Sequence, residues 1–113
     1  MKATTNNFFG ATLFLILTFG VFAQTNGLPR LKKGEAYKSV RAKMLKAGWQ
    51  PFRAPDADEC ADGDERCAGR PEMQSCAGTG MANCKFLWKR KGKTLAIFTV
   101  GETAVYDGHE YEK

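Results

Sequence analysis

The sequence has few of the side chains on which enzymes usually depend. It contains a single histidine, His109, near the end of the chain, where residues often fray. Glu72 and Glu102 stand apart from the other acidic residues, and as a glycosidase pair they would have to face each other across a cleft. We therefore expect His109 to be exposed and to have no catalytic role. We predict a protein that is not an enzyme and has no catalytic residue.

The chain also lacks the cysteine spacings of redox and zinc sites. Its four cysteines are Cys60, Cys67, Cys76 and Cys84, and no two of them form a Cys-x-x-Cys pair. Zinc ligands are usually roughly two to four residues apart, and these gaps are wider, with no histidine nearby. An even number of cysteines in an exported chain indicates disulfides instead. Of the three possible pairings, Cys60 with Cys67 and Cys76 with Cys84 is the simplest. We expect no metal and no cofactor.

Two glycine-containing stretches lack the context of a phosphate-binding loop. The stretch "CAGTGMANC", residues 76–84, has no apolar strand before it and no helical pattern after it. The Gly-Lys-Thr sequence at 92–94 has Leu87 where such a loop needs another glycine. We interpret residues 76–84 as a turn closed by a disulfide, in which Gly78 and Gly80 adopt positive φ angles.

No apolar run reaches the roughly 20 residues that a membrane-spanning helix needs. The longest one, residues 8–22 ("FFGATLFLILTFGVF"), follows Lys2 and ends before Ala23. A basic start, a short apolar core and small residues at a cleavage site are the parts of a secretory signal peptide. We predict that residues 1–23 are a signal peptide cleaved after Ala23. Residues 24–113 would then form a single small domain, without a membrane span, in the periplasm or outside the cell.

Residues 34–49 ("GEAYKSVRAKMLKAGW") have the apolar period of an amphipathic helix. One face of this helix would carry Tyr37, Val40, Met44 and Ala47. We expect Glu35 in the first turn, where a carboxylate suits the helix dipole, and Gly48 at the C-terminal cap. The basic residues of this part of the chain predict a positively charged, solvated face: Arg30, Lys32, Lys33, Lys38, Arg41, Lys43, Lys46 and Arg53.

The next part, residues 54–73, is acidic and has almost no large apolar side chain. Its carboxylates crowd into residues 56–65: Asp56, Asp58, Glu59, Asp62, Asp64 and Glu65. We interpret it as a surface excursion closed by Cys60 and Cys67. Its spacing partly resembles a calcium loop, but a cysteine occupies one ligand position and Gly69 stands where a bidentate glutamate is needed. A loosely held cation is a hypothesis, and a solvated acidic loop is the better interpretation.

From residue 84 onward the chain has strand patterns separated by turns. The segment "CKFLWKR" alternates, with Phe86 and Trp88 on one face and Leu87 among lysines on the other. Further strands are expected at 94–100 and 103–106. The expected turns are Lys91-Gly92, Gly101-Glu102 and Asp107-Gly108.

These elements predict an α+β fold. One amphipathic helix would pack on an antiparallel meander of three strands, or four if residues 49–53 join it. Disulfides would cross-link this domain. The expected core consists of Tyr37, Val40, Met44, Phe86, Trp88, Val100 and either Ile97 or Phe98.

The helix and the second half of the chain resemble known exported proteins. The segment "AYKSVRAKMLKAGWQP" resembles the Tyr-x-x-Val-Arg…Gly-Trp-x-Pro pattern of small, uncharacterised exported bacterial proteins, and "PEMQSCAGTGMANCKFLW" resembles their Cys-x7-Cys β segment. The helix followed by a meander is similar to half-repeats of β-lactamase inhibitor proteins and of PASTA modules. The resemblance implies an exported recognition or assembly module. It implies no catalytic residue, and the acidic excursion has no counterpart in it.

The separated charges predict a binding function. The formal net charge is +5, but acidic and basic residues are segregated along the chain, which favours oriented docking. We expect the acidic excursion to bind another exported or envelope protein, as an inhibitor or immunity-type protein binds an enzyme. The alternative partner is an anionic polymer: lipopolysaccharide, phospholipid or nucleic acid. Its binding site would be a basic hairpin that carries Lys85, Lys89, Arg90, Lys91 and Lys93.

Overall fold

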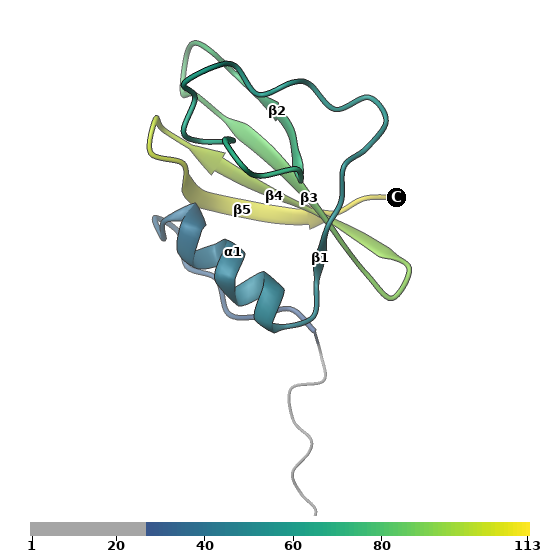
Figure 1. The fold of residues 1–113 in the computed structure, drawn as a ribbon. Coiled ribbons are helices and arrows are strands. Elements are labelled where there is room, and N and C mark those ends of the chain that lie inside the picture. The colour runs from purple at the N-terminus through teal and green to yellow at the C-terminus, as the bar shows by residue number, and fades with distance from the viewer. Residues whose placement is uncertain (1–26) are drawn as a thin grey trace, which may run out of the picture.

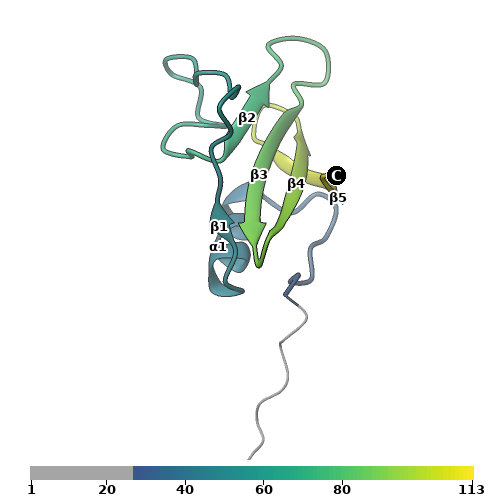
Figure 2. The ribbon, with the colours of Figure 1, turned by 90° about the vertical axis from the view of Figure 1, so that its right-hand side faces the viewer.

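The protein combines one helix with one antiparallel sheet. The computed structural model describes residues 27–113, and the predicted signal peptide lies outside them. The elements in chain order are α1 (Tyr37–Lys46), β1 (Gln50–Pro51), β2 (Met73–Cys76), β3 (Cys84–Arg90), β4 (Lys93–Val100) and β5 (Val105–Tyr111). Helix α1 covers one face of the sheet (Figures 1 and 2). The α+β prediction is confirmed, with five strands where three or four were expected.

Strand β3 organises the sheet. It pairs along one side with β4, which pairs in turn with β5. Along its other side it pairs with β1 near its end, where Pro51 lies opposite Trp88, and with β2 near its start, where Cys76 lies opposite Cys84. All of these pairings are antiparallel. Of residues 49–53, Gln50 and Pro51 join the sheet, which was the four-strand alternative that the sequence left open. Strand β2 is one that the sequence did not predict.

Helix α1 follows its sequence pattern closely. Tyr37, Val40 and Met44 are its buried residues. The helix ends in a Schellman motif, since the amide of Gly48 donates to Leu45 O and the amide of Trp49 donates to Met44 O. Gly48 has a φ of 92°, which glycine adopts without strain.

The start of the helix differs from the prediction. Glu35 precedes the helix, so the first turn contains no acidic residue. Its carboxylate instead accepts hydrogen bonds from Ser39 Oγ at 2.8 Å and from Lys43 Nζ at 2.7 Å. The hydrogen bond from Lys43 lowers the pKa of Glu35 to about 2. Glu35 thus holds the segment before α1 through ion pairing rather than through the helix dipole.

The core lies between α1 and the sheet. Phe86 and Trp88 of β3 are fully buried there, opposite Ile97 and Leu95 of β4, and the Tyr37 ring stacks on Phe86 with the ring centroids 3.9 Å apart. One core prediction was wrong, because Val100 is only half-buried. Leu87 lies on the opposite face from Phe86 and Trp88, as predicted, and is buried there as well. The chain at the two ends of the excursion packs against Leu87. The Leu87 amide donates a hydrogen bond to Glu72 O, and the Leu87 carbonyl accepts one from the Phe52 amide.

Strand β5 is longer than predicted. It continues through Asp107-Gly108, where the sequence indicated a break. Phe98 lies opposite Gly108 and Thr99 lies opposite Tyr106, so Asp107 is the extra residue of a β-bulge. His109 therefore belongs to a paired strand, exposed as expected but not frayed.

Both predicted disulfides are present. Cys60 is bonded to Cys67, and Cys76 is bonded to Cys84. No cysteine of residues 27–113 is free. The same residues contain no helix that is long and apolar enough to cross a membrane.

Candidate functional site

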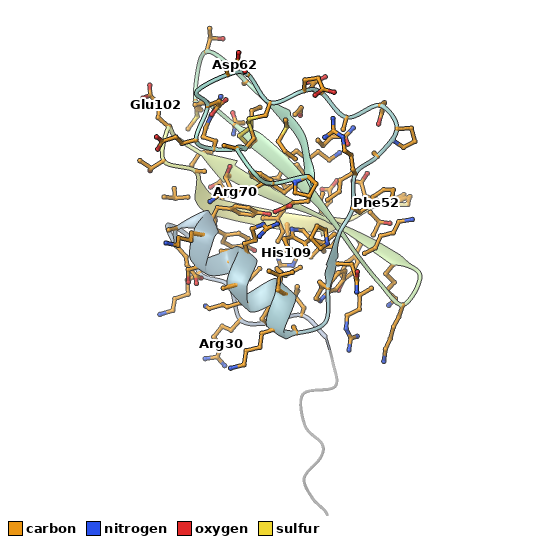
Figure 3. The ribbon with its side chains drawn as sticks, in the orientation of Figure 1. Arg30, Phe52, Asp62, Arg70, Glu102 and His109 are labelled. Carbon is orange, nitrogen blue, oxygen red and sulfur yellow. A yellow bond between two sulfur atoms is a disulfide. The ribbon has the colours of Figure 1, made fainter. Side chains whose placement is uncertain are left out.

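Three loops meet at one end of the sheet, which we call the loop end. They are residues 61–66 of the excursion, residues 77–83 between β2 and β3, and residues 101–104 between β4 and β5 (Figure 2). Figure 3 shows Asp62 and Glu102 at this same end of the molecule, although they come from different loops. The loops enclose an open hollow of about 340 Å³. It is lined by Gly63, Asp64, Glu65, Arg66, Ala77, Gly78, Ala82 and Glu102.

Arg66 connects two of these loops. Its Nη1 donates to Ala77 O at 2.8 Å and to Ala82 O at 3.2 Å. Its Nε and Nη2 donate to the carboxylate of Asp64 at 2.9 and 2.6 Å. This bidentate pair lowers the pKa of Asp64 and raises that of Arg66, so both groups stay charged. The excursion and the 77–83 loop are therefore braced against each other.

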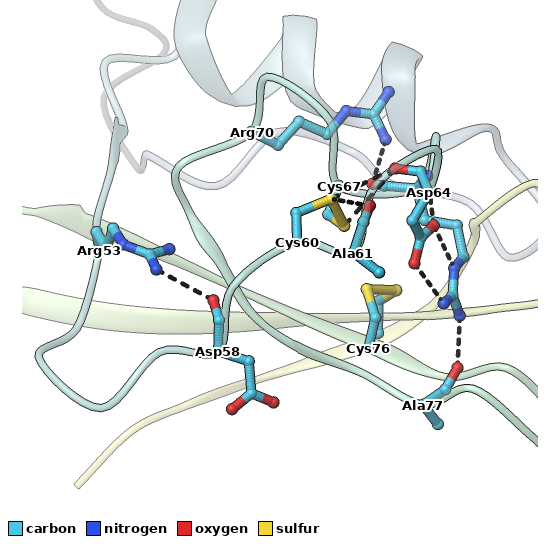
Figure 4. Close-up of a disulfide and its surroundings, with 11 residues drawn as sticks. Arg53, Asp58, Cys60, Ala61, Asp64, Cys67, Arg70, Cys76 and Ala77 are labelled. Carbon is cyan, nitrogen blue, oxygen red and sulfur yellow. Dashed lines mark hydrogen bonds and ion pairs between the residues drawn. A yellow bond between two sulfur atoms is a disulfide. The ribbon is translucent and has the colours of Figure 1, made fainter.

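The two disulfides lie side by side under the loop end (Figure 4). The Sγ atoms of Cys67 and Cys76 and a carboxylate oxygen of Asp64 all lie within 4.8 Å of one another. Disulfide sulfur has no thiolate to offer a metal ion. Among residues 27–113 this is the only such group, so the excursion brings no three carboxylates together and the cation hypothesis gains no support.

The 77–83 loop is closed and internally bonded. The Cys76–Cys84 disulfide lies at its base, the Ala77 amide donates to Asn83 O at 2.7 Å, and the Gly101 amide donates to Met81 O at 2.9 Å. Gly80 has a positive φ of 67°, as predicted, but the second left-handed residue is Ala82 and not Gly78. At the apex, the apolar side chain of Met81 is 68 % exposed.

The six acidic residues of the excursion do not act as one group. Asp56 accepts a hydrogen bond from Gln74, and Arg53 contacts both Asp58 and Glu59, away from the loop end (Figure 4). Asp64 is neutralised by Arg66. At the loop end, Asp62 and Glu65 are exposed, and Glu102 joins them from the turn before β5. The sequence did not assign Glu102 to this site, because only the pairing of β4 with β5 carries it there.

The basic hairpin is formed as predicted at the opposite end of β3. Lys91 and Gly92 have φ angles of 51° and 79°, which a type I′ turn requires at both of its central positions. The five predicted residues separate in space. Lys89, Lys91 and Lys93 are exposed at the tip, Arg90 donates to Ala47 O, and Lys85 pairs with Glu112. Lys89 lies over the Phe52 ring at 4.1 Å, and Lys93 lies over the Tyr111 ring at 5.7 Å.

A buried polar cluster links α1 to the segment before β2. The carboxylate of Glu72 is completely buried and accepts hydrogen bonds from Tyr37 Oη, Arg41 Nε and Arg41 Nη2. Tyr37 Oη in turn accepts from Trp88 Nε1 at 3.1 Å. Burial, and then the charge of Glu72, raise the pKa of Tyr37. Glu72 is therefore a structural carboxylate with no open face toward a substrate.

A scan against protein-family models, a search of curated proteins and a search of solved structures each found no match to this chain. The resemblance to exported bacterial proteins and to inhibitor or PASTA half-repeats stays a prediction.

Proposed function

We propose that this chain is an exported binding protein that docks its loop end on a basic surface of another exported or envelope protein. The single observation that carries the proposal is the exposed Met81 at the apex of a loop that a disulfide and the Arg66 brace hold in place. A rigid loop loses little conformational entropy on binding, and one buried apolar anchor can supply much of the binding energy.

The charges of the loop end determine the kind of partner. The hollow is lined by one cationic side chain, Arg66, and by three carboxylates, those of Asp64, Glu65 and Glu102, so its net charge is negative by two. The exposed carboxylate of Asp62, next to Gly63 in the same loop, adds a third negative charge. A lysine or arginine of the partner would enter the hollow while Met81 occupies a small apolar pocket. This is the surface expected of an inhibitor or immunity-type protein whose target has a basic cleft, and it needs no catalytic residue on this chain.

Export supports the same interpretation. The predicted signal peptide leads to an oxidising compartment, and disulfides persist in such compartments. With two disulfides, a small domain can keep a fixed binding surface despite its limited core.

Site-specific photo-crosslinking tests the proposal. A photoreactive residue at position 81 should capture one protein from the cell envelope. The same residue at Leu45, which is 46 % exposed on α1, should not capture it. With the captured protein purified, Met81→Ser and Glu102→Lys should each weaken binding by at least about tenfold, as expected for hot-spot residues. Leu45→Ser and Asp107→Lys are the matched controls. Equal affinity of all four variants and the natural protein would reject the loop end as the docking surface.

The basic hairpin supports a second candidate function, binding of an anionic polymer. Lys89 and Lys93 lie over aromatic rings, and Tyr111 is 47 % exposed, so charge and a stacking surface occur together. On an anionic resin, Lys91→Glu should elute at clearly lower salt than the natural protein, whereas Lys32→Glu should change little. Passage of the natural protein through the resin at low salt would reject this candidate.

A further inference from the structure

A groove runs between α1 and the end of the excursion, away from the loop end and the hairpin. It has a volume of about 330 Å³ and no acidic lining residue. It is lined by Lys38, Arg41, Ala42, Leu45, Ala68, Gly69 and Arg70. Three of these side chains are cationic, and the predicted functions of the loop end and the hairpin use none of them.

Arg41 is held in place by a buried anion. Its Nε and Nη2 donate to the two carboxylate oxygens of Glu72 at 2.6 and 3.2 Å, which fixes the plane of the guanidinium group. The Glu72 side chain is 0 % exposed and that of Arg41 is 25 % exposed, so the pair spans the boundary between core and groove. The hydrogen bond to Glu72 raises the pKa of Arg41, which keeps it charged. Among residues 27–113, Nη1 has no hydrogen-bond partner.

Arg70 is also pre-positioned, on the same tyrosine that contacts Glu72. Its guanidinium carbon lies 5.0 Å from the centre of the Tyr37 ring, and its Nη1 donates to Arg66 O at 2.8 Å. Within the described part of the chain, its Nε and Nη2 make no hydrogen bond. Figure 3 shows Arg70 beside α1. Two oriented guanidinium groups thus meet at one groove, and the three nitrogens that make no hydrogen bond carry five N–H groups between them.

The charge balance of the groove selects the ligand. Lys38, Arg41 and Arg70 oppose the single carboxylate of Glu72, which leaves two positive charges. A phosphomonoester is a dianion at neutral pH and offers three acceptor oxygens in the geometry that guanidinium groups recognise. Leu45, 46 % exposed, and Ala42 give the groove an apolar side, which suits the organic group of an ester better than free phosphate.

We propose that this groove binds the phosphomonoester group of an organic molecule through Lys38, Arg41 and Arg70. The proposal does not depend on the loop end or the hairpin, because neither contributes a residue to it. The groove uses the buried Glu72 only to orient Arg41, so this carboxylate serves both the fold and the site.

The test follows backbone amide signals of the purified protein by NMR during titration with phenyl phosphate, a monoester with an apolar ring. Saturable shifts are expected at Lys38, Arg41 and Arg70, with weaker affinity as the pH falls below about 6 and the dianion becomes protonated. Lys38→Gln and Arg70→Gln should each weaken binding by about tenfold, as loss of a hydrogen bond between charged groups does. Lys32→Gln, which changes an exposed lysine elsewhere, should bind normally.

Two further probes distinguish the sources of such a group. Inorganic phosphate should bind more weakly than phenyl phosphate, and equal affinity would overturn the organic ester in favour of free phosphate. Vesicles that contain phosphatidic acid, a lipid monoester, should bind more of the protein than vesicles of phosphatidylglycerol, a diester, if a lipid headgroup is the source. If they do not, the source is a soluble ester. Absence of saturable shifts with phenyl phosphate, or unchanged affinity of both Lys38→Gln and Arg70→Gln, would overturn the proposal.

Discussion

Arg41 Nε lies 2.6 Å from Glu72 Oε2, although the two residues are 31 positions apart in the chain. This contact fastens the segment before β2 to helix α1, and it does so inside the protein, where a charge without a partner is costly. Tyr37 and Trp88 extend the contact into the core through two further hydrogen bonds. The cluster makes the stability of the fold sensitive to single polar substitutions.

Removal of the carboxylate should destabilise the protein strongly. Glu72→Ala leaves Arg41 and the Tyr37 hydroxyl without their common partner, and breaking such a pair costs about 3 kcal/mol or more. Glu59→Ala, at a side chain that is 94 % exposed, should change the free energy of unfolding by less than about 0.5 kcal/mol. Urea denaturation followed by Trp fluorescence measures both. Similar midpoints for the two variants would show that the buried pair has no special role.

Loss of one hydroxyl should have a smaller effect in the same cluster. Tyr37→Phe keeps the ring that stacks on Phe86 but deprives Trp88 Nε1 of its acceptor and Glu72 of one donor. An unsatisfied buried group costs about 1–3 kcal/mol. Tyr111→Phe, at an exposed tyrosine, should be nearly neutral. Thermal unfolding of both variants gives the comparison, and a Tyr37→Phe protein as stable as the natural one would contradict it.

The ion pair of Glu35 should make stability depend on pH. The pKa of Glu35 is lowered from 4.5 to about 2, chiefly by Lys43, so the native state favours the charged carboxylate. The stabilisation is present above pH 4.5 and is lost as the pH falls toward 2. Asp64, whose pKa Arg66 lowers, acts in the same direction. Melting curves at several pH values should fall less steeply in this range for Glu35→Gln than for the natural protein. Parallel pH profiles would contradict the pairing.

The local parts of this fold were predictable from the sequence. The period of Tyr37, Val40 and Met44 gave the helix, and alternation around Phe86 and Trp88 gave the main strand, because both signals depend on near neighbours. Neighbouring cysteines also paired as the shortest loops suggested.

What the sequence missed depends on contacts between distant segments. Strand β2 contains one large apolar residue, Met73, and becomes a strand only because β3 offers it a partner. Glu72 looked isolated because its partners lie on α1. Glu102 reaches the loop end only through the pairing of β4 with β5. At Asp107-Gly108 a turn signal was overridden, since a bulge allows the strand to continue.

The end of α1 allows a prediction about backbone conformation. Gly48 has a φ of 92°, and a Cβ there would lie 3.4 Å from Arg90 Nε. Gly48→Ala should therefore destabilise the protein by about 1 kcal/mol or more, because L-residues avoid this conformation. Gly78→Ala is the matched control, since Gly78 has no positive φ and open space around its Cα. Denaturant midpoints should separate the two variants, and equal values would contradict the role of Gly48.

Arg66 should control the rigidity of the loop end. Arg66→Gln removes the contacts to Ala77 O and Ala82 O, which join the excursion to the 77–83 loop, and also the ion pair with Asp64, but it leaves both disulfides intact. The amides of Ala77, Ala82 and Gly101, which are bonded within and beside this loop, should then exchange with deuterium about tenfold faster. Arg53→Gln, at an arginine that is 40 % exposed and contacts Asp58 and Glu59, should leave them unchanged. If Met81 anchors the partner because its loop is rigid, Arg66→Gln should also weaken partner binding, although Met81 itself is unchanged. Slow exchange of these amides in Arg66→Gln would mean that the disulfide alone holds the loop.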